Sequence, residues 1–282
     1  MSIYLEVLMF GALLGLPFLY ETRPTFSYCL KFVCYYTVVM INSVILIPPF
    51  SFRPRNVLNL VVASYFCHWI THVIGVKWIL RDGKHLEADQ SCVIVCNHQS
   101  SLDILGMFQI WPTMRKCTVL AKKSLFWIWP FGLAAWLAGI VFIPRVKTDR
   151  ARVVLNQAMG KLVKNKIKLW IFPEGTRRNT GEIHTFKKGA FHAAISNQLP
   201  VIPVVFSRYY FLDRANKKFD QGSVIIKVLA PMSTKGLTLD DVDSFTEEVC
   251  QKMAEAFREV NREVSKEMES NCDLKRVAQL KQ

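Results

Sequence analysis

A histidine and an aspartate lie five positions apart in the short segment NHQSSLD at residues 97–103. Imidazole titrates near neutral pH, so His98 could take a proton from a hydroxyl group as a general base. A carboxylate on the other ring nitrogen fixes the tautomer and stabilises the imidazolium, which would be the role of Asp103. Five positions exceed the helical i,i+4 spacing, so we expect His98 in a turn and Asp103 in the first turn of the following helix. The alternative is a capped turn without chemistry. Ser100 and Ser101 are expected to cap the helix rather than to act as nucleophiles.

A second segment, FPEGTRRNTG at residues 172–181, combines a glycine with two arginines. Glycine permits a close approach of the backbone to a ligand, and the guanidinium groups of Arg177 and Arg178 could bind phosphate. Lys187 and Lys188 precede a predicted helix, whose amino end also favours anions. We therefore predict a phosphate-binding site, with a solvated turn held by an ion pair as the alternative. Neither the P-loop nor the dinucleotide glycine pattern occurs in the chain, so a nucleoside triphosphate in a P-loop is not expected.

Each of these polar segments follows an apolar, β-branched run. CVIVC precedes His98, KLWIF precedes the segment that holds Glu174, and GIVFI precedes Arg145. In open parallel sheets, ligands bind beyond the carboxyl ends of the strands. We therefore expect these residues to meet at one edge of a sheet.

The rest of the chain from residue 76 alternates between strand-like and helical patterns, which predicts an α/β fold with a mostly parallel sheet flanked by helices. The last helix is expected to start near a capping box formed by Thr238 and Asp241 and to cover the core. The expected strands are Val76–Leu80, Cys92–Cys96, Cys117–Ala121, Gly139–Ile143, Lys168–Phe172, Val201–Phe206 and Val224–Leu229, and the expected helices between them are Leu102–Ile110, Ala151–Asn165 and Ala190–Asn197.

The first 75 residues have the composition of a membrane segment. Two uncharged stretches of 21 residues, Phe32–Phe52 and Asn56–Val76, are separated by the basic sequence RPR at 53–55. We interpret them as a membrane-embedded helical hairpin, spanning or re-entrant, with two buried helices of a soluble core as the alternative. The predicted organisation is residues 1–75 as the membrane-associated segment, 76–235 as the α/β domain, and 236–282 as an amphipathic helix with a polar tail.

A further uncharged stretch of 21 residues, Ser124–Pro144, could cross a membrane by hydropathy alone. Pro130 and two glycines interrupt it, and its end is suited to a strand. A crossing would also place His98 and Glu174 on opposite sides of the bilayer. We therefore predict an interfacial helix followed by a buried strand, with no crossing.

The composition and net charge limit the classes of partner that the chain is expected to bind. The chain has 282 residues, a mean hydropathy of +0.20 and a net charge of +14, of which residues 144–192 hold twelve basic and three acidic side chains. This balance favours an anionic partner: nucleic acid, anionic lipid or a polyphosphate ligand. The eight cysteines show no paired spacing, so neither disulfides nor a metal site is expected, and the catalytic part is placed in a reducing compartment.

Four blocks in this order resemble those of the glycerophospholipid acyltransferase family. They are NHQSSLD, GIVFIPR at 139–145, FPEGTRR at 172–178 and LPVIPVV at 199–205. The resemblance covers about residues 76–230. It implies that His98 is the base, with Asp103 as its partner, in direct acyl transfer from acyl-CoA to the sn-2 hydroxyl of lysophosphatidic acid, without an acyl-enzyme. The acceptor-binding positions that it implies are Glu174, Gly175, Thr176 and Arg177, with Arg145, Lys122 and Lys187 as further phosphate contacts.

The resemblance also implies an enzyme of the endoplasmic reticulum membrane that uses acyl-CoA as co-substrate and no cofactor or metal, and we expect its active site on the cytosolic side. Pro144 and the Lys-Ser pair after Lys122 depart from the usual residues of the family blocks, which bears on acceptor binding. The alternatives are another acceptor (glycerol 3-phosphate, a lysophospholipid or lysocardiolipin), transacylation without acyl-CoA, and a non-enzymatic membrane protein that binds anionic lipid or nucleic acid. The favoured interpretation has no nucleic acid partner.

Overall fold

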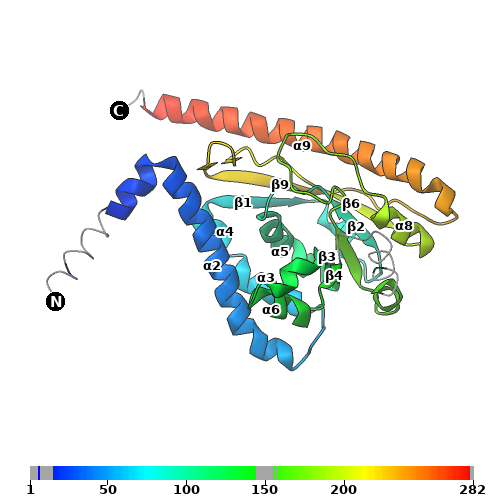
Figure 1. Cartoon of the computed structure of the whole chain (residues 1–282). Coiled ribbons are helices and arrows are strands. Elements are labelled where there is room, and N and C mark those ends of the chain that lie inside the picture. The colour runs from blue at the N-terminus through cyan, green and yellow to red at the C-terminus, as the bar shows by residue number, and fades with distance from the viewer. Residues whose placement is uncertain (1–5, 7–14, 144–154, 156–157, 280–282) are drawn as a thin grey trace.

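The computed structural model describes residue 6, residues 15–143, residue 155 and residues 158–279, without the side chains of 268–279. A seven-stranded sheet forms its centre, in the order β1-β9-β6-β2-β5-β3-β4 (Figure 1). Neighbouring strands are parallel except for β6 and β9, so the expected α/β fold with a mostly parallel sheet is confirmed. The strands of this sheet are β1 (Val76–Arg81), β2 (Val93–Cys96), β3 (Cys117–Lys122), β4 (Val141–Ile143), β5 (Lys168–Ile171), β6 (Val201–Phe206) and β9 (Gly222–Val228).

The central strands β2, β5 and β6 are buried along their whole length, as expected for parallel strands covered on both faces. The sequence did not reveal one element next to them. A two-stranded hairpin, β7 (Leu212–Asp213) and β8 (Lys218–Phe219), connects β6 to β9. This connection contains no crossover helix, and β9 turns back beside β6 and pairs with it in the antiparallel direction.

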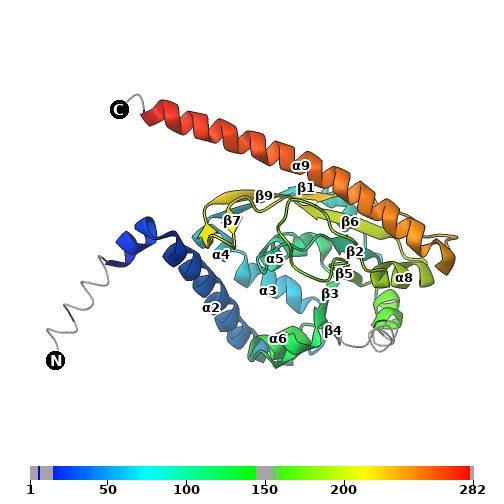
Figure 2. The same ribbon diagram turned by 45° about the horizontal axis from the view of Figure 1, so that its top comes forward.

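Helices cover both faces of the sheet (Figures 1 and 2). Alternate residues of each strand point to opposite faces: Ile94 and Cys96 belong to one hydrophobic cluster, whereas Val93 and Val95 belong to the other. The first cluster packs against α2 (Pro24–Ser51), α3 (Asn59–Cys67), α4 (Ile70–Ile74) and α5 (Asp103–Met114), and the second packs against α8 (Gly189–Ser196) and α9 (Val242–Gln279). Further elements are α6 (Phe131–Leu137) and the short 3₁₀ helices η1 (Gly83–Leu86), η2 (Lys123–Trp127) and η3 (Leu239–Asp241). Residues 15–22 and 158–164 are also helical; the latter belong to the expected helix Ala151–Asn165, most of whose first half lies outside the described residues.

The expected capping box is present: Thr238 and Asp241 exchange the two hydrogen bonds that precede α9. The predicted apolar face of α9 is buried on the sheet, at Val242, Phe245, Val249, Met253, Ala256, Val260 and Val264. An ion pair of 2.6 Å between Lys227 and Glu259 adds a contact from β9 to this helix. The last helix is therefore a core-covering helix, as its periodicity predicted.

The N-terminal hairpin differs from the expectation in its second arm. Helix α2 is the one helix of the described residues long and apolar enough to cross a membrane. The stretch 56–76 instead forms two short helices, α3 and α4, of nine and five residues, and Gly75 ends α4 in the left-handed conformation. Leu60 and Ile70 on this arm are buried in the core beneath the sheet. Histidine and small polar residues interrupt the apolar stretch 56–76. Its two short helices pack on the protein instead of forming one long helix.

Residues 124–143 form η2, α6 and β4, which leaves no span in this stretch. Strand β4 pairs in parallel with β3 at the edge of the sheet, and its three residues are half-buried rather than buried as expected. An edge strand has a neighbour on one side only, which explains its exposure. Trp127 and Trp129 are 74% and 73% exposed, so apolar surface remains on η2 and the turn after it.

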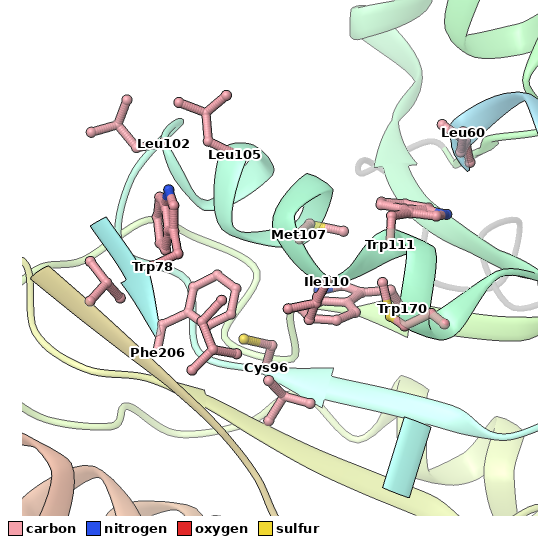
Figure 3. Close-up of a cluster of buried hydrophobic side chains, with 14 of the residues drawn as sticks. Leu60, Trp78, Cys96, Leu102, Leu105, Met107, Ile110, Trp111, Trp170 and Phe206 are labelled. Atoms are coloured by element: carbon pink, nitrogen blue, oxygen red, sulfur yellow. The ribbon is translucent and has the colours of Figure 1, made fainter. Parts of the chain in front are cut away.

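Helix α5 lies close to the sheet because Gly106 faces two aromatic rings (Figure 3 shows the surrounding cluster). A Cβ atom at this position would lie 2.7 Å from Trp78 Cζ3 and 3.0 Å from Phe206 Cε2. Both rings are buried and held by their neighbours, so neither can move away freely. The distance between α5 and the sheet thus depends on the absence of a side chain at residue 106.

We predict that Gly106→Ala lowers the free energy of unfolding by about 1–3 kcal/mol, the usual cost of one extra methyl group in a packed core. The measurement is the thermal unfolding midpoint in detergent. Gly160→Ala is the matched control, because a Cβ atom there meets nothing within 4 Å and the substitution relieves the helix of a flexible residue. Equal midpoints for Gly106→Ala and the wild type would contradict this packing constraint.

Candidate active site

The segment 97–103 forms a turn directly after β2, as the sequence predicted. Asn97 begins it and continues the pairing of β2 with β6: its Nδ2 donates to Phe206 O (2.9 Å) and its Oδ1 accepts from Phe206 N (2.8 Å). The next residue, His98, has its Nδ1 atom 2.6 Å from Asp103 Oδ2. Asp103 is the first residue of α5, so the helix start folds back on the turn and brings the two side chains together.

The carboxylate of Asp103 is fully buried and accepts four hydrogen bonds. His98 Nδ1 and Gln99 N contact Oδ2, at 2.6 and 2.9 Å. Ser100 N and Tyr209 Oη contact Oδ1, at 3.0 and 2.8 Å. Burial of a charged carboxylate is costly unless donors replace the lost water, and these four donors do so.

The two serines of the turn make contacts that do not resemble those of an activated nucleophile. Ser100 Oγ accepts a long hydrogen bond of 3.3 Å from Leu102 N, a contact within the turn. Ser101 Oγ accepts from the hydroxyl of Tyr36 on α2, at 2.9 Å. The N-cap residue of α5 is Leu102 and no side chain caps the helix, so the expectation of a helix cap is wrong for both serines.

The loop after β5 lies against the same turn. Glu174 Oε1 accepts from His98 N (2.9 Å), and Arg178 N donates to His98 O (2.8 Å), so the backbone of the histidine is held on both sides. The ring of Phe172 stacks on the imidazole, with centroids 4.0 Å apart. Three contacts from one loop thus fix both the position and the plane of His98.

The second nitrogen of His98 points to the exposed side of the site. Arg177 Nε lies 3.4 Å from His98 Nε2, and the arginine is exposed. A guanidinium group only donates hydrogen bonds, and the carboxylate of Asp103 only accepts them. This arrangement requires the proton on Nδ1 and a free lone pair on Nε2, which is the tautomer that a general base needs.

The other predicted binding residues lie around this point. Gly175 has a φ of +70°, which favours glycine, and a Cβ atom there would lie 2.8 Å from Lys187 Nζ, so the lysine side chain lies against this glycine. Thr176 and Lys122 are exposed; Thr176 is in the loop, whereas Lys122 ends β3 at the same sheet edge. Arg145 lies outside the described residues. Among the residues that the structure describes, no three metal-ligating side chains lie together.

Tyr209 and Asn179 belong to this arrangement and were missed in the sequence. Tyr209 donates to Asp103, and Asn179 Nδ2 donates to Tyr209 O at 3.0 Å, which connects the loop after β5 to the segment after β6. The rule of strand ends could have found Tyr209, because it lies three residues after the end of β6. The fourth sequence block, residues 199–205, overlaps β6, so the same rule predicts functional residues in the segment 207–210 that follows this strand.

The chain is of the acyltransferase class: residues 77–207, which include this site, match the Acyltransferase family model. The chain is 37% identical to human 1-acyl-sn-glycerol-3-phosphate acyltransferase alpha over 247 residues, which is 87% of each chain. It is 36% identical to the 1-acyl-sn-glycerol-3-phosphate acyltransferase of Saccharomyces cerevisiae over 209 residues, 73% of this chain and 68% of that one. The chain therefore belongs to the 1-acyl-sn-glycerol-3-phosphate acyltransferase family.

A solved structure shares the fold. The crystal structure of the 1-acyl-sn-glycerophosphate (LPA) acyltransferase PlsC from Thermotoga maritima superposes with a TM-score of 0.65 at 22% identity, over 84% of this chain and 97% of that one. The architecture of sheet and helices is thus common to both proteins.

The carboxyl of Glu174 is in an unusual electrostatic environment. Burial raises its pKa to about 7, although the hydrogen bond from His98 N–H opposes the rise, and the nearby charge of Asp103 adds to it. A pKa above the unfolded value means that the folded state prefers the protonated form. Its contribution to stability is therefore full below the unfolded pKa of about 4.5 and is lost as the pH rises through about 7.

We predict that Glu174→Gln removes this pH dependence, because glutamine keeps an oxygen for His98 N–H and has no proton to lose. The wild-type unfolding midpoint should fall more between pH 5 and pH 8 than that of the variant, by a few degrees. Thermal scans at the two pH values measure the difference. Glu182→Gln, an exposed carboxylate in the same loop, is the control, and a response equal to that of Glu174→Gln would contradict the argument.

Proposed function

We propose that this protein transfers an acyl group from acyl-CoA to the sn-2 hydroxyl of 1-acylglycerol 3-phosphate and so produces phosphatidic acid. The observation that carries the proposal is the His98–Asp103 pair beside a loop with Arg177 and Lys187, in a chain related over most of its length to enzymes of that name. The pair supplies a base, and the loop supplies positive charge for a phosphate monoester.

The geometry supports direct transfer. His98 Nε2 takes the proton of the acceptor hydroxyl while its oxygen attacks the thioester carbonyl, and Asp103 stabilises the imidazolium that forms. The tetrahedral intermediate then expels the thiolate of coenzyme A, which takes the proton from the imidazolium. The new ester bond replaces the thioester, and no metal or acyl-enzyme is needed. Ser100 and Ser101 are buried, and their hydroxyl groups are hydrogen-bonded to Leu102 N and to Tyr36, which disfavours them as covalent nucleophiles.

The acceptor head is proposed to lie over the loop after β5. Arg177 is exposed beside the base, so its guanidinium group could hold the phosphate while the hydroxyl reaches His98 Nε2. Lys187, whose Nζ lies beside Gly175, is proposed as a further phosphate contact, together with Arg145 and Lys122. Glu174 contacts the backbone of His98, which supports a role in holding the turn in addition to the acceptor role suggested by resemblance.

A panel of acceptors with labelled acyl-CoA tests this function. We expect product with 1-acylglycerol 3-phosphate and much less with glycerol 3-phosphate, lysophosphatidylcholine or lysocardiolipin, and none when acyl-CoA is omitted. His98→Ala should lower kcat by about 10²–10⁴-fold, the usual contribution of general base catalysis. Arg177→Ala should raise KM for the phosphate acceptor by about 10–100-fold, the value of a charged hydrogen bond.

Lys235→Ala is the control for a general loss of positive charge, because Lys235 is exposed and follows β9, whose carboxyl end lies at the opposite edge of the sheet. It should leave KM unchanged. Full activity of His98→Ala would contradict the base assignment, and product formation without acyl-CoA would indicate transacylation.

Association with the membrane is part of the proposal, and α2 suggests its form. One side of α2 contacts the protein along its length: Lys31 Nζ donates to Phe219 O (2.8 Å), Tyr35 Oη to Ser101 O (2.9 Å) and Asn42 Nδ2 to Phe66 O (2.9 Å). The opposite side exposes Val33, Ile41, Val44 and Ile45, which are 50–59% exposed. We propose that α2 lies against the bilayer on this apolar side, at the cytosolic face of the endoplasmic reticulum.

We predict that the double variant Trp127→Ser/Trp129→Ser binds vesicles of anionic phospholipid about tenfold more weakly, because two exposed indoles on η2 and the following turn would insert at the interface. Vesicle flotation measures the bound fraction. Leu239→Ser on η3, which removes a 56% exposed apolar side chain near the start of α9, is the control. Equal loss of binding in both variants would contradict the assignment of this surface.

A further inference from the structure

Tyr209, which donates a hydrogen bond to Asp103, lies outside the four sequence blocks. The phenol oxygen lies 2.8 Å from Asp103 Oδ1, on the carboxylate oxygen opposite the one that contacts His98. Neither Tyr209 nor Asp103 has measurable exposure, so no water competes for this contact. The carboxylate thus depends on Tyr209 for one of its four donors.

The direction of this hydrogen bond is fixed by the chemistry of the two groups. Burial, together with the adjacent negative charge of Asp103, raises the pKa of the Tyr209 phenol well above its usual value of 10. The phenol therefore keeps its proton and donates it. Asp103 accepts from two backbone N–H groups, Gln99 N and Ser100 N, which can only donate. Each of these contacts therefore has Asp103 as the acceptor.

The ring of Tyr209 is also held firmly. It stacks on Phe211 with centroids 5.5 Å apart and meets Trp78 edge-on at 6.0 Å. The backbone carbonyl oxygen of Tyr209 accepts from Asn179 Nδ2, on the loop that carries Arg177. The phenol is therefore a fixed donor, placed by the segment after β6 and connected to the loop after β5.

We propose that Tyr209 is a positioning residue for the acyl transfer: its hydroxyl holds Asp103 in the rotamer that faces His98 and draws negative charge toward the far carboxylate oxygen. The inference rests on the proposed function, because His98 is the proposed base. Without the hydroxyl, one buried lone pair of Asp103 Oδ1 would lose its donor, and the carboxylate would be held less firmly opposite His98. More of its charge would also remain on Oδ2 and stabilise the imidazolium.

Other titratable groups face the pair and have to be considered with it. Glu174 and Arg177 approach from the loop after β5 and contact His98 directly. Cys96 on β2 and Tyr35 on α2 lie close enough to sense the charge of Asp103. Tyr209 alone among the tyrosines described donates to the carboxylate, so its removal changes the pair while these groups stay in place.

Tyr209→Phe in the full-length protein tests the inference, because phenylalanine keeps the ring contacts and removes the donor. We expect kcat to fall about 10–100-fold with little change in KM, since a hydrogen bond to a charged group is lost. The acid limb of the kcat/KM profile should move to higher pH by about half a unit or more, because the imidazolium is stabilised. Tyr210→Phe is the matched control; Tyr210 is partly exposed and packs beside Arg208.

A second measurement does not depend on turnover. The rate at which diethyl pyrocarbonate modifies His98, followed by peptide mass spectrometry across pH, reports the free imidazole. Its midpoint should move to higher pH in Tyr209→Phe and not in Tyr210→Phe. An unmoved midpoint, with or without a lower kcat, would reduce Tyr209 to a packing residue and overturn the inference. If the wild type acylates no acceptor, the proposed function fails, and the midpoint alone decides the effect of Tyr209 on the pair.

Discussion

The structure of the site depends on one constraint: a charged carboxylate, Asp103, is buried without access to water. Removing such a group from water costs several kcal/mol unless hydrogen-bond donors replace the solvent. The donors come from two places in the chain: His98 and two backbone amides of its turn, and the hydroxyl of Tyr209. The turn, the start of α5 and the segment after β6 must therefore be brought together in the folded protein.

The order of strands meets this requirement. Strand β2 lies between β5 and β6, so the segments that follow these three strands emerge side by side. Asn97 adds two hydrogen bonds to Phe206 and holds the first of these segments to the third. Glu174 and the backbone of Arg178 hold the second against His98. The segments after β5 and β6, the two neighbours of β2, thus hold different parts of the histidine–aspartate pair. Gly106 lets α5, whose first residue is Asp103, lie close to the sheet.

Much of this arrangement can be predicted from the sequence. Alternating strand and helix patterns predict all seven strands of the central sheet, and the strand-end rule alone places His98 and Glu174 at one edge of it. Contacts between residues distant in the sequence are not predictable in the same way. The pairing of Tyr209 with Asp103 spans 106 positions and leaves no local periodicity or spacing. The break of the 56–76 stretch into α3 and α4 was missed because hydropathy reports apolar content, which a membrane helix and a buried helix share.

The turn at 97–103 also explains why a helix suited to lipid belongs to the same fold. Two consecutive tyrosines of α2 reach the turn: Tyr35 donates to Ser101 O, and Tyr36 donates to Ser101 Oγ. Tyr36 is 45% exposed, whereas Tyr35 is buried, so this part of α2 marks the border between the packed protein and its apolar outer side. His98, the proposed base, therefore lies between a basic loop on one side and an apolar helix on the other. The proposed acceptor, with a phosphate head and an acyl chain, would need these two surroundings at once, so the contact of α2 with the turn at 97–103 fits an amphiphilic substrate.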